Sequence, residues 1–451
     1  FMIGNQNKYQ KFFQSISKNA LRKNIKGFLD AKAKEKTLRY DQGIGPSSDP
    51  EPNVKESVGG LRDYHTALWA VAIRFGCLSF REIPRSDIIS SEELDILDRS
   101  IDFALRVRNE LHYLKNKRQD VLTHSLQKEV SANLRYKETD EVLRVEQFMR
   151  DYYLHARNVK HLSDLIFERL KGASSVANRA VGFIVRRAFD DGAVLSRTQI
   201  FLPQKRKTFF KDDPYRLLSL FLDAQLFGVT INETAQRAII DNLHLIDDDF
   251  RKSPKASKFF LDILRAQAGV APTLRQMHEL GVLGAYIPVF GGLTCLVQYN
   301  LYHIYTADEH TLVAVENLEK LRSGDLPQDL RPLSRVFREI PRPELLYLAL
   351  LLHDAGKAAR GKDHSIVGAQ MARDLLAQAG YPDGLEIELA TTAGHAWWTP
   401  VATVYKDQAE DAGVTVNLRQ VPLDGYWSDV WMVHPFAHSY WPFYQADQFM
   451  S

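Results

Sequence analysis

Residues 348 to 365 read LALLLHDAGKAARGKDHS, an apolar run that ends in ionisable side chains. The pair His353-Asp354 offers one imidazole nitrogen and one carboxylate, which suits Mn, Fe, Zn or Mg according to the other ligands present. Adjacent residues of a helix point about 100° apart, so the pair can meet one ion only at a helix end or with help from other helices. Ala355-Gly356 supplies such an end. The stretch therefore predicts a catalytic or metal-binding position where a buried helix stops.

Three further side chains belong to this candidate site. Lys357 follows closely enough to offset charge on a phosphate, and His364 lies in the loop or helix start beyond it. His310, in YTADEHTLVAVENL, begins another helix, in which Leu312, Val315 and Leu318 are predicted to face the core. Each histidine taken alone is more simply explained as an ordinary core or surface histidine. Together they favour a metal site that activates water, because an apolar helix has little structural reason to bury an ionisable pair. The candidate ligands are His310, His353, Asp354 and His364.

The elements that must hold these residues are helices, because the hydrophobic period is helical almost throughout to about residue 380. Between Ser91 and Lys115, leucine and isoleucine recur at spacings near three and four and mark one buried stripe. Its predicted members are Leu94, Leu97, Ile101, Leu105 and Leu111. A second helix is predicted from an N-cap at Asp213, a proline at the first helical position, Pro214, and a stop at Gly228.

Near residue 380 the pattern changes. LEIEL (385–389) and VTVNLRQV (414–421) alternate apolar and polar residues as half-buried strands do, and TPVATVYKDQAEDAG between them has the character of a helix. The predicted order is strand, helix, strand. Five of the six tryptophans fall in the last 55 residues, and this compositional step favours a separate module over an aromatic-rich subdomain.

The bulk composition restricts the possible partners and compartment. A net charge of +2 argues against a global field that recruits nucleic acid or an anionic membrane. No segment reaches the ~20 apolar residues of a membrane span, and the first residues lack the apolar core of a signal peptide. Cys77 and Cys295 lie far apart, which fits a reducing cytoplasm. We expect a cytoplasmic globular protein of two to four domains that, opening on Phe1, begins inside a longer protein.

These motifs resemble a known family. The order H…HD followed by AGK is similar to the HD superfamily of metal-dependent phosphohydrolases. NLYHIYTADEHT with LLHDAGKAARGKDHS resembles the HD domain of the bifunctional PII uridylyltransferase/uridylyl-removing enzymes of bacterial nitrogen signalling. Other segments resemble the same enzymes in the same order, over about residues 5 to 375. They are NVKESVGGLRD, RVRNELHYL, FMRDYYLHAR, LIDDDFRKSPKASKFFLDIL and MHELGVLGAYIPVFG.

The resemblance implies a fold and a domain order. We expect a mainly α chain in which a helical companion domain precedes an all-α HD domain, with a small α/β segment at the end. The predicted divisions are a companion domain at 1–175, a helical linker or first part of the HD region at 176–290, a truncated HD domain at 291–378 and an α/β fragment at 379–451.

The resemblance also implies a reaction, the hydrolysis of the phosphodiester that joins UMP to a tyrosine of the PII protein. A divalent metal, Mn or Mg, would be held by His310, His353, Asp354 and His364, and Lys357 would stabilise developing negative charge. The implied partners are uridylylated PII and UMP or UTP, with no nucleic acid and no membrane. The family's closing aspartate ligand does not follow here, so that an acidic group elsewhere would have to replace it.

Two alternatives to the hydrolase remain open. Uridylyl transfer would need the family's nucleotidyltransferase domain, whose Gly-Ser loop and paired aspartates precede the matching segment and are not found in this chain. Within the companion domain, Gly59, Gly60 and Arg62 offer a weak phosphate site at a helix N-terminus, although a glycine turn that opens an amphipathic helix explains them as well. The second alternative is a non-catalytic helical or solute-binding remnant with an incidental histidine cluster.

The last segment suggests a different origin. LLAQAGYPDGLEIELATTAGH and AEDAGVTVNLRQVPLDGYWSDVWMVHPFAHSYW resemble a C-terminal piece of a periplasmic solute-binding protein of the peptide and opine ABC-transporter type. Because an exported receptor and a cytoplasmic enzyme do not share a compartment, we hypothesise that the chain is a chimera joined at roughly residues 370 to 380.

Overall fold

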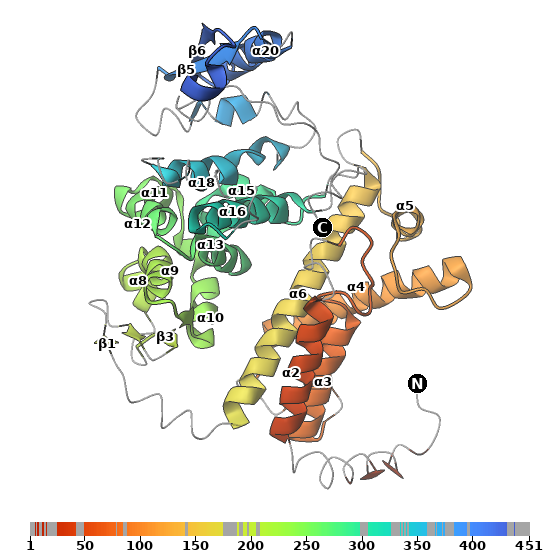
Figure 1. Cartoon of the computed structure of the whole chain (residues 1–451). Coiled ribbons are helices and arrows are strands. Elements are labelled where there is room, and N and C mark those ends of the chain that lie inside the picture. Colours follow the sequence, from red (N-terminus) through yellow and green to blue (C-terminus); the bar gives the residue numbers. More distant parts are fainter. Residues whose placement is uncertain are drawn as a thin grey trace. The chain divides into compact units, whose positions relative to one another are not determined.

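The computed structural model of the chain is mainly α-helical, which confirms the predicted fold class (Figure 1). The structure describes residues 25–41, 49–77, 79–83, 88–139, 143–174, 187–188, 193–195, 198–203, 208–297, 305–325, 342–358, 383–394 and 397–430, together with scattered single positions.

The described α-helices are α2 (Ile25–Asp41), α3 (Leu61–Phe75), α4 (Ser91–Lys115), α5 (His124–Asn133), α6 (Arg144–Ser174), α8 (Phe209–Asp212), α9 (Arg216–Phe227), α10 (Glu233–Asp241), α11 (Asp248–Lys252), α12 (Pro254–Arg265), α13 (Val270–Glu279), α14 (Val282–Tyr286), α15 (Pro288–Gly292), α16 (Ala307–Ser323), α18 (Pro343–Leu352) and α20 (Trp398–Glu410). The single-turn helices are η3 (Phe80–Glu82), η4 (Leu243–Leu245), η6 (Ala355–Ala358) and η7 (Tyr426–Val430). The strands are β1 (Arg187–Ala188), β2 (Val194–Leu195), β3 (Gln199–Phe201), β4 (Thr230–Ile231), β5 (Leu385–Thr392) and β6 (Val414–Val421).

The chain divides into two compact units. The first contains residues 1–319 and 343–351, and the second contains residues 320–342 and 352–451. The four domain ranges expected from the sequence remain predictions.

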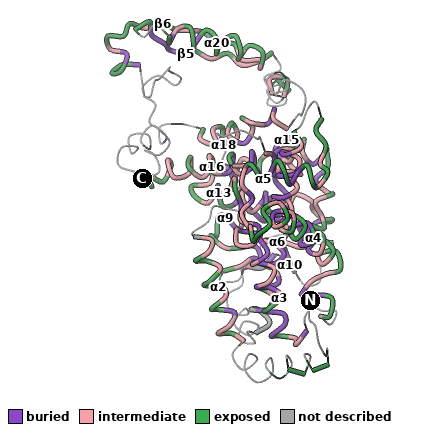
Figure 2. The backbone as a smooth tube through the Cα atoms, turned by 90° about the vertical axis from the view of Figure 1, so that its right-hand side faces the viewer, coloured by how far each residue is buried: buried purple, intermediate pink, exposed green. Residues whose placement is uncertain are grey.

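Helices α2 to α6 share one hydrophobic core in the first unit, where buried positions gather between the helices (Figure 2). Helix α4 starts with a capping box, in which the Ser90 hydroxyl accepts from the Glu93 N–H and the Glu93 carboxylate accepts from the Ser90 N–H. Of its predicted stripe, Leu97, Ile101 and Leu111 are buried.

The prediction for Leu105 is wrong, because this side chain is 41% exposed. Ala104 occupies the core-facing position instead. The two residues are neighbours in sequence, so their side chains point about 100° apart on the helix. The buried stripe therefore passes through an alanine that the leucine pattern did not reveal.

A second group of helices in this unit runs from α9 to α15. Helix α9 ends as predicted at Gly228, which adopts the left-handed conformation with φ 59°. The helix begins at Arg216, two residues later than Pro214. Beside it lies a small sheet in the order β1-β2-β3-β4, in which β3 and β4 are parallel and the other pairs antiparallel.

Helices α16 and α18 supply the candidate chemistry. In α16, Leu312 and Val315 are 1% and 0% exposed, as predicted for its core face, whereas Leu318, predicted for the same face, is only half-buried. In α18, Tyr347 and Leu351 are fully buried. Helix α18 is also tied to α12, because Arg265 donates a 3.2 Å hydrogen bond to Glu344.

The second unit contains the predicted strand, helix and strand. Strands β5 and β6 pair in parallel from Leu385 opposite Val414 onward, and α20 connects them. Trp398, at the start of α20, is fully buried against Ala390 and Tyr426. The structure therefore confirms the βαβ pattern that alternation predicted.

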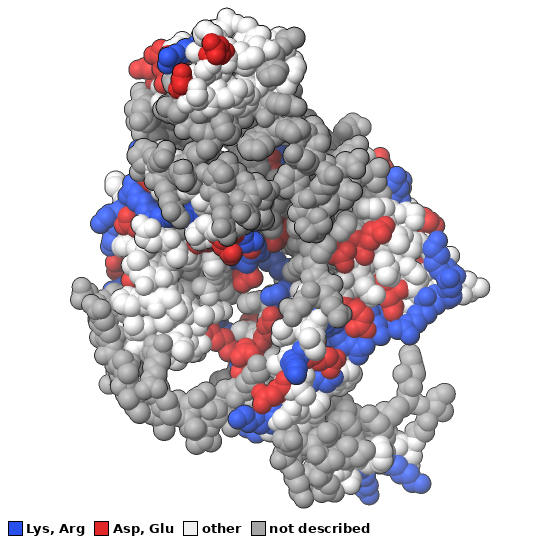
Figure 3. Space-filling model, in the orientation of Figure 1, with Lys and Arg blue, Asp and Glu red and all other residues white. Residues whose placement is uncertain are grey.

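None of the helices that the structure describes combines the length and apolar character needed to cross a bilayer. Lysine and arginine are interspersed with aspartate and glutamate over much of the described surface in Figure 3, in keeping with the net charge of +2.

Candidate metal centre

Three of the predicted metal ligands come together in the structure. One potential ligand atom from each of His310, His353 and Asp354 lies within 4.8 Å of the other two. His310 stands in the first turn of α16, and His353 caps the C-terminus of α18. Residues 307–319 of α16 and 343–351 of α18 belong to the first compact unit, and the pair His353-Asp354 follows directly where α18 stops.

The helix end gives adjacent side chains a common direction. The Nε2 atom of His353 lies 3.4 Å from Oδ2 of Asp354, although a regular helix would point the two residues apart. After the pair, the chain turns into η6, where the Lys357 N–H donates to the Asp354 carbonyl oxygen over 2.9 Å. This is the change of backbone direction that Ala355-Gly356 predicted.

The site combines a partly buried carboxylate with accessible imidazoles. The Asp354 side chain is 11% exposed and the His353 side chain 36% exposed. Lys357 Nζ donates a 2.9 Å hydrogen bond to Asp354 Oδ2, which offsets the carboxylate charge. Two imidazoles and one carboxylate within reach of one another fit a divalent cation of the Mn, Fe or Zn type. His364 lies outside the described residues.

Acidic side chains of α16 secure this helix against α13. Asp308, one turn before the buried Leu312, accepts from His278 over 3.0 Å, and Glu319 accepts from two backbone N–H groups at the start of α13. Burial alone would raise the pKa of Asp308, but the hydrogen bond and charge of His278 hold it below its usual range. None of these residues was among the site residues predicted from the sequence. The sequence does show carboxylates recurring along this helix, but only the packing of the helices shows which groups these carboxylates contact.

The glycine turn proposed as a weak phosphate site is engaged in bonds within the protein. Gly60 N–H donates to the Ser57 carbonyl over 2.8 Å, and the N–H of Arg62 donates to the Lys55 carbonyl over 2.8 Å. Gly59 N–H donates to the Asp63 carboxylate over 2.7 Å. These N–H groups therefore already donate to acceptors within the protein. The geometry favours the alternative interpretation, in which a glycine turn opens α3.

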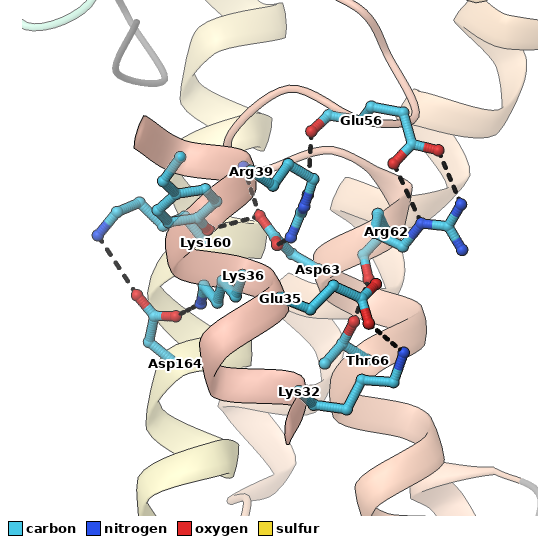
Figure 4. Close-up of polar contacts among 12 residues, drawn as sticks. Lys32, Glu35, Lys36, Arg39, Glu56, Arg62, Asp63, Thr66, Lys160 and Asp164 are labelled. Carbon is cyan, nitrogen blue, oxygen red and sulfur yellow. Dashed lines mark hydrogen bonds and ion pairs between the residues drawn. The ribbon is translucent and has the colours of Figure 1, made fainter. Parts of the chain in front are cut away.

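Arg62 is likewise occupied by a neighbour. Its guanidinium donates to both carboxylate oxygens of Glu56, at 2.8 and 3.1 Å (Figure 4). This bidentate contact holds the pKa of Glu56 down at about 2. An incoming phosphate would have to displace a carboxylate that already matches the guanidinium fork.

Asp63 organises the polar core around this turn. Its side chain is fully buried and accepts from Arg39, from the Tyr40 hydroxyl over 2.7 Å and from Gly59 N–H. Figure 4 shows Lys36 close by, paired with Asp164 of α6. Burial lowers the pKa of Lys36 to about 8, although the charge of Asp63 opposes this shift. The cluster joins α2, α3 and α6 and has a structural role.

Three family descriptions match successive parts of the chain. "GlnD PII-uridylyltransferase" matches residues 27–167, "Uridylyltransferase GlnD third domain" matches 197–286, and "HD domain" matches 309–402. The third match contains His310, His353 and Asp354. The cluster found in the structure thus lies within the HD match.

Curated relatives match the same part of the chain. Proteins of Cereibacter sphaeroides, Ectopseudomonas mendocina and Azospirillum brasilense, each named "Bifunctional uridylyltransferase/uridylyl-removing enzyme", are 35%, 34% and 32% identical over 357, 354 and 380 residues. The alignments cover 78%, 76% and 82% of this chain and 38%, 38% and 40% of the relatives. The chain therefore spans about two fifths of the length of these relatives.

The comparisons do not support a solute-binding origin for residues 379–451. The HD match continues to residue 402, so the hypothetical junction at 370 to 380 falls inside it. The parallel strand pair and its connecting helix agree with that hypothesis but are a general local arrangement and do not identify a family.

Proposed function

Since the chain contains GlnD uridylyltransferase domains and an HD domain and has homologues named as bifunctional uridylyltransferase/uridylyl-removing enzymes, we propose that it hydrolyses the phosphodiester joining UMP to a tyrosine of a PII protein. The observation that carries this proposal is the His310, His353 and Asp354 cluster inside the HD match.

Each residue of the site has a role in this reaction. His310 and His353 offer imidazole nitrogens, and Asp354 offers a carboxylate oxygen, to Mn or Mg. A bound divalent cation would lower the pKa of a coordinated water and polarise the phosphoryl oxygen. Lys357, already directed at Asp354, is close enough to offset negative charge on the phosphoryl group. His364 is proposed as a further ligand.

The proposed partners follow from the same reaction. Uridylylated PII is the substrate, and UMP and unmodified PII are the products. A cytoplasmic location fits such a substrate, and Cys77 and Cys295 are both buried and form no disulfide. Uridylyl transfer from UTP is the second candidate, supported by the match of residues 27–167 to the PII-uridylyltransferase family.

The test measures UMP release from uridylylated PII by the purified chain, with and without added Mn. We expect release that requires metal and that falls at least ~100-fold in His353→Ala, because the variant loses a direct metal ligand. His244→Ala is the matched control, because His244 is exposed and lies outside the cluster.

Two results would refute the hydrolase proposal. One is no UMP release from a folded wild-type chain in the presence of Mn or Mg. The other is equal release by wild type and His353→Ala, which would place the chemistry elsewhere. Metal-dependent labelling of unmodified PII by UTP would instead support the second candidate.

A further inference from the structure

A buried polar chain reaches from α6 to the helix that carries His310. Its central contact joins His278 of α13 to Asp308 of α16, with 3.0 Å between Nε2 and Oδ2. The two residues are 8% and 3% exposed. The ring of Phe290 stands edge-on to the His278 imidazole at 5.4 Å and restricts its orientation. Removing either polar partner would leave the other buried without its main contact.

Arg157 extends this contact to α6. Its Nη2 atom donates to the His278 carbonyl oxygen over 2.6 Å, and its Nη1 atom lies 3.1 Å from His278 Nε2. A guanidinium can only donate hydrogen bonds. His278 Nε2 can therefore either accept from Arg157 or donate to Asp308, but cannot do both at once. The bond to the carbonyl oxygen is independent of that choice and fixes the position of His278.

The contact between His278 and Asp308 lies at the N-terminal end of α16, the end that carries His310. Asp308 stands two residues before His310, in the same helical turn. The preceding backbone is also held, because Ala307 N–H donates to the Leu296 carbonyl over 2.9 Å and His310 N–H donates to the Thr306 carbonyl over 2.8 Å. A shift of Asp308 would therefore move the backbone that carries the metal-ligating imidazole.

The opposite end of α16 has a contact of similar type. The Glu319 carboxylate accepts from the N–H groups of Val270 and Ala271 at 3.0 and 2.9 Å. Both Asp308 and Glu319 thus fasten α16 to α13, and Asp308 is much closer to His310 in the helix. Glu319 can therefore serve as a control for a general loss of contact between α16 and α13.

We propose that Asp308 is a positioning residue of the metal centre: His278, itself held by Arg157, holds Asp308 so that His310 is presented at the correct place. Through Arg157, a residue of α6 in the PII-uridylyltransferase match takes part in aligning a ligand of the HD match. The inference rests on the proposed function only in that it requires the metal site.

The experiment measures Mn binding to the purified chain by titration, with the electron paramagnetic resonance spectrum of bound Mn as a second readout. Asp308→Ala should weaken Mn binding about tenfold, a typical effect of losing a supporting contact behind a metal ligand. Asp308→Asn retains an acceptor for His278 and should recover most of the affinity. Glu319→Ala should reduce stability to urea but leave Mn affinity and spectrum unchanged.

Should Asp308→Ala fail to fold, Arg157→Met replaces it, because Arg157 is half-buried and lies one step further from His310. The proposal is overturned if the alanine variant binds Mn like wild type, or if Glu319→Ala weakens binding as much. It also falls if wild type binds no Mn. A wild type that binds Mn but releases no UMP would refute only the hydrolase proposal.

Discussion

Replacing Gly59 by alanine tests whether the glycine turn before α3 is structural. Gly59 has φ +77°, a left-handed conformation that costs a non-glycine residue about 1–2 kcal/mol. In addition, an added Cβ would lie 2.1 Å from the carbonyl oxygen and 2.6 Å from the carbonyl carbon of Ala156. Both atoms belong to the backbone of α6, so no side-chain rotation can relieve the overlap.

The chain contains a matched glycine without this overlap. Gly228 also has a positive φ, +59°, but an added Cβ there meets nothing within 4 Å. Gly228→Ala should therefore lose only the conformational term, about 1–2 kcal/mol. Gly59→Ala must also separate α3 from α6, and overpacking of this kind adds about 1–3 kcal/mol. We expect a total loss of about 2–5 kcal/mol.

The assay is urea denaturation followed by far-ultraviolet circular dichroism on wild type and the two variants. The expected order of midpoints is wild type, then Gly228→Ala, then Gly59→Ala. Equal losses in the two variants would contradict the steric argument, because they share only the backbone term. A Gly59→Ala protein of normal stability would reopen a role for the turn in binding phosphate.

Three further predictions concern charge and metal. Because burial lowers the pKa of Lys36 to about 8 from 10.5 in the unfolded chain, the unfolded state binds more protons between these values, and this lysine makes stability rise with pH there. The unfolding free energy of wild type minus that of Lys36→Met, measured by urea denaturation, should rise by up to about 3 kcal/mol from pH 7.5 to pH 10. A difference that stays constant would exclude the lowered pKa of Lys36. Arg169, whose side chain is 7% exposed, donates to Glu93 and Glu233. Arg169→Met should therefore lower the unfolding free energy measured in urea by about 3–5 kcal/mol, and adding Glu233→Gln should restore part of that loss. A loss below about 1 kcal/mol would show that the contacts contribute little to stability. Finally, Mn at about 100 times its dissociation constant should stabilise wild type by about 2.7 kcal/mol in thermal unfolding but not His353→Ala, and equal stabilisation of both would place the metal elsewhere.

Local sequence signals predicted the elements whose causes are local. Gly228 ends α9 because a left-handed residue is needed there, and alternation over residues 385–389 and 414–421 gave β5 and β6. The same reasoning failed at Leu105, since a leucine pattern indicates a face but does not exclude the alanine beside it. For Arg62 the sequence left a weak phosphate site and a glycine turn both open, because the contact of Arg62 with Glu56 depends on the turn between them.

The candidate site divides in the same way. The residue types and the helix end at Ala355-Gly356 were sufficient to select His353 and Asp354, because an ionisable pair after an apolar helix has a local signature. Their meeting with His310, more than forty positions earlier, was an expectation that depended on the packing of α16 and α18.

The sequence by itself thus determined which side chains can bind a cation and which helices carry them, because ligand chemistry and helix ends depend on neighbouring residues. Tertiary structure decided which charged groups face one another. Asp308 contacts His278, His278 contacts Arg157, and Asp63 accepts from Arg39, across distances in sequence that no periodicity encodes. The physical reason is that burial makes each of these polar groups dependent on particular partners, and only the packed helices place those partners within hydrogen-bonding distance.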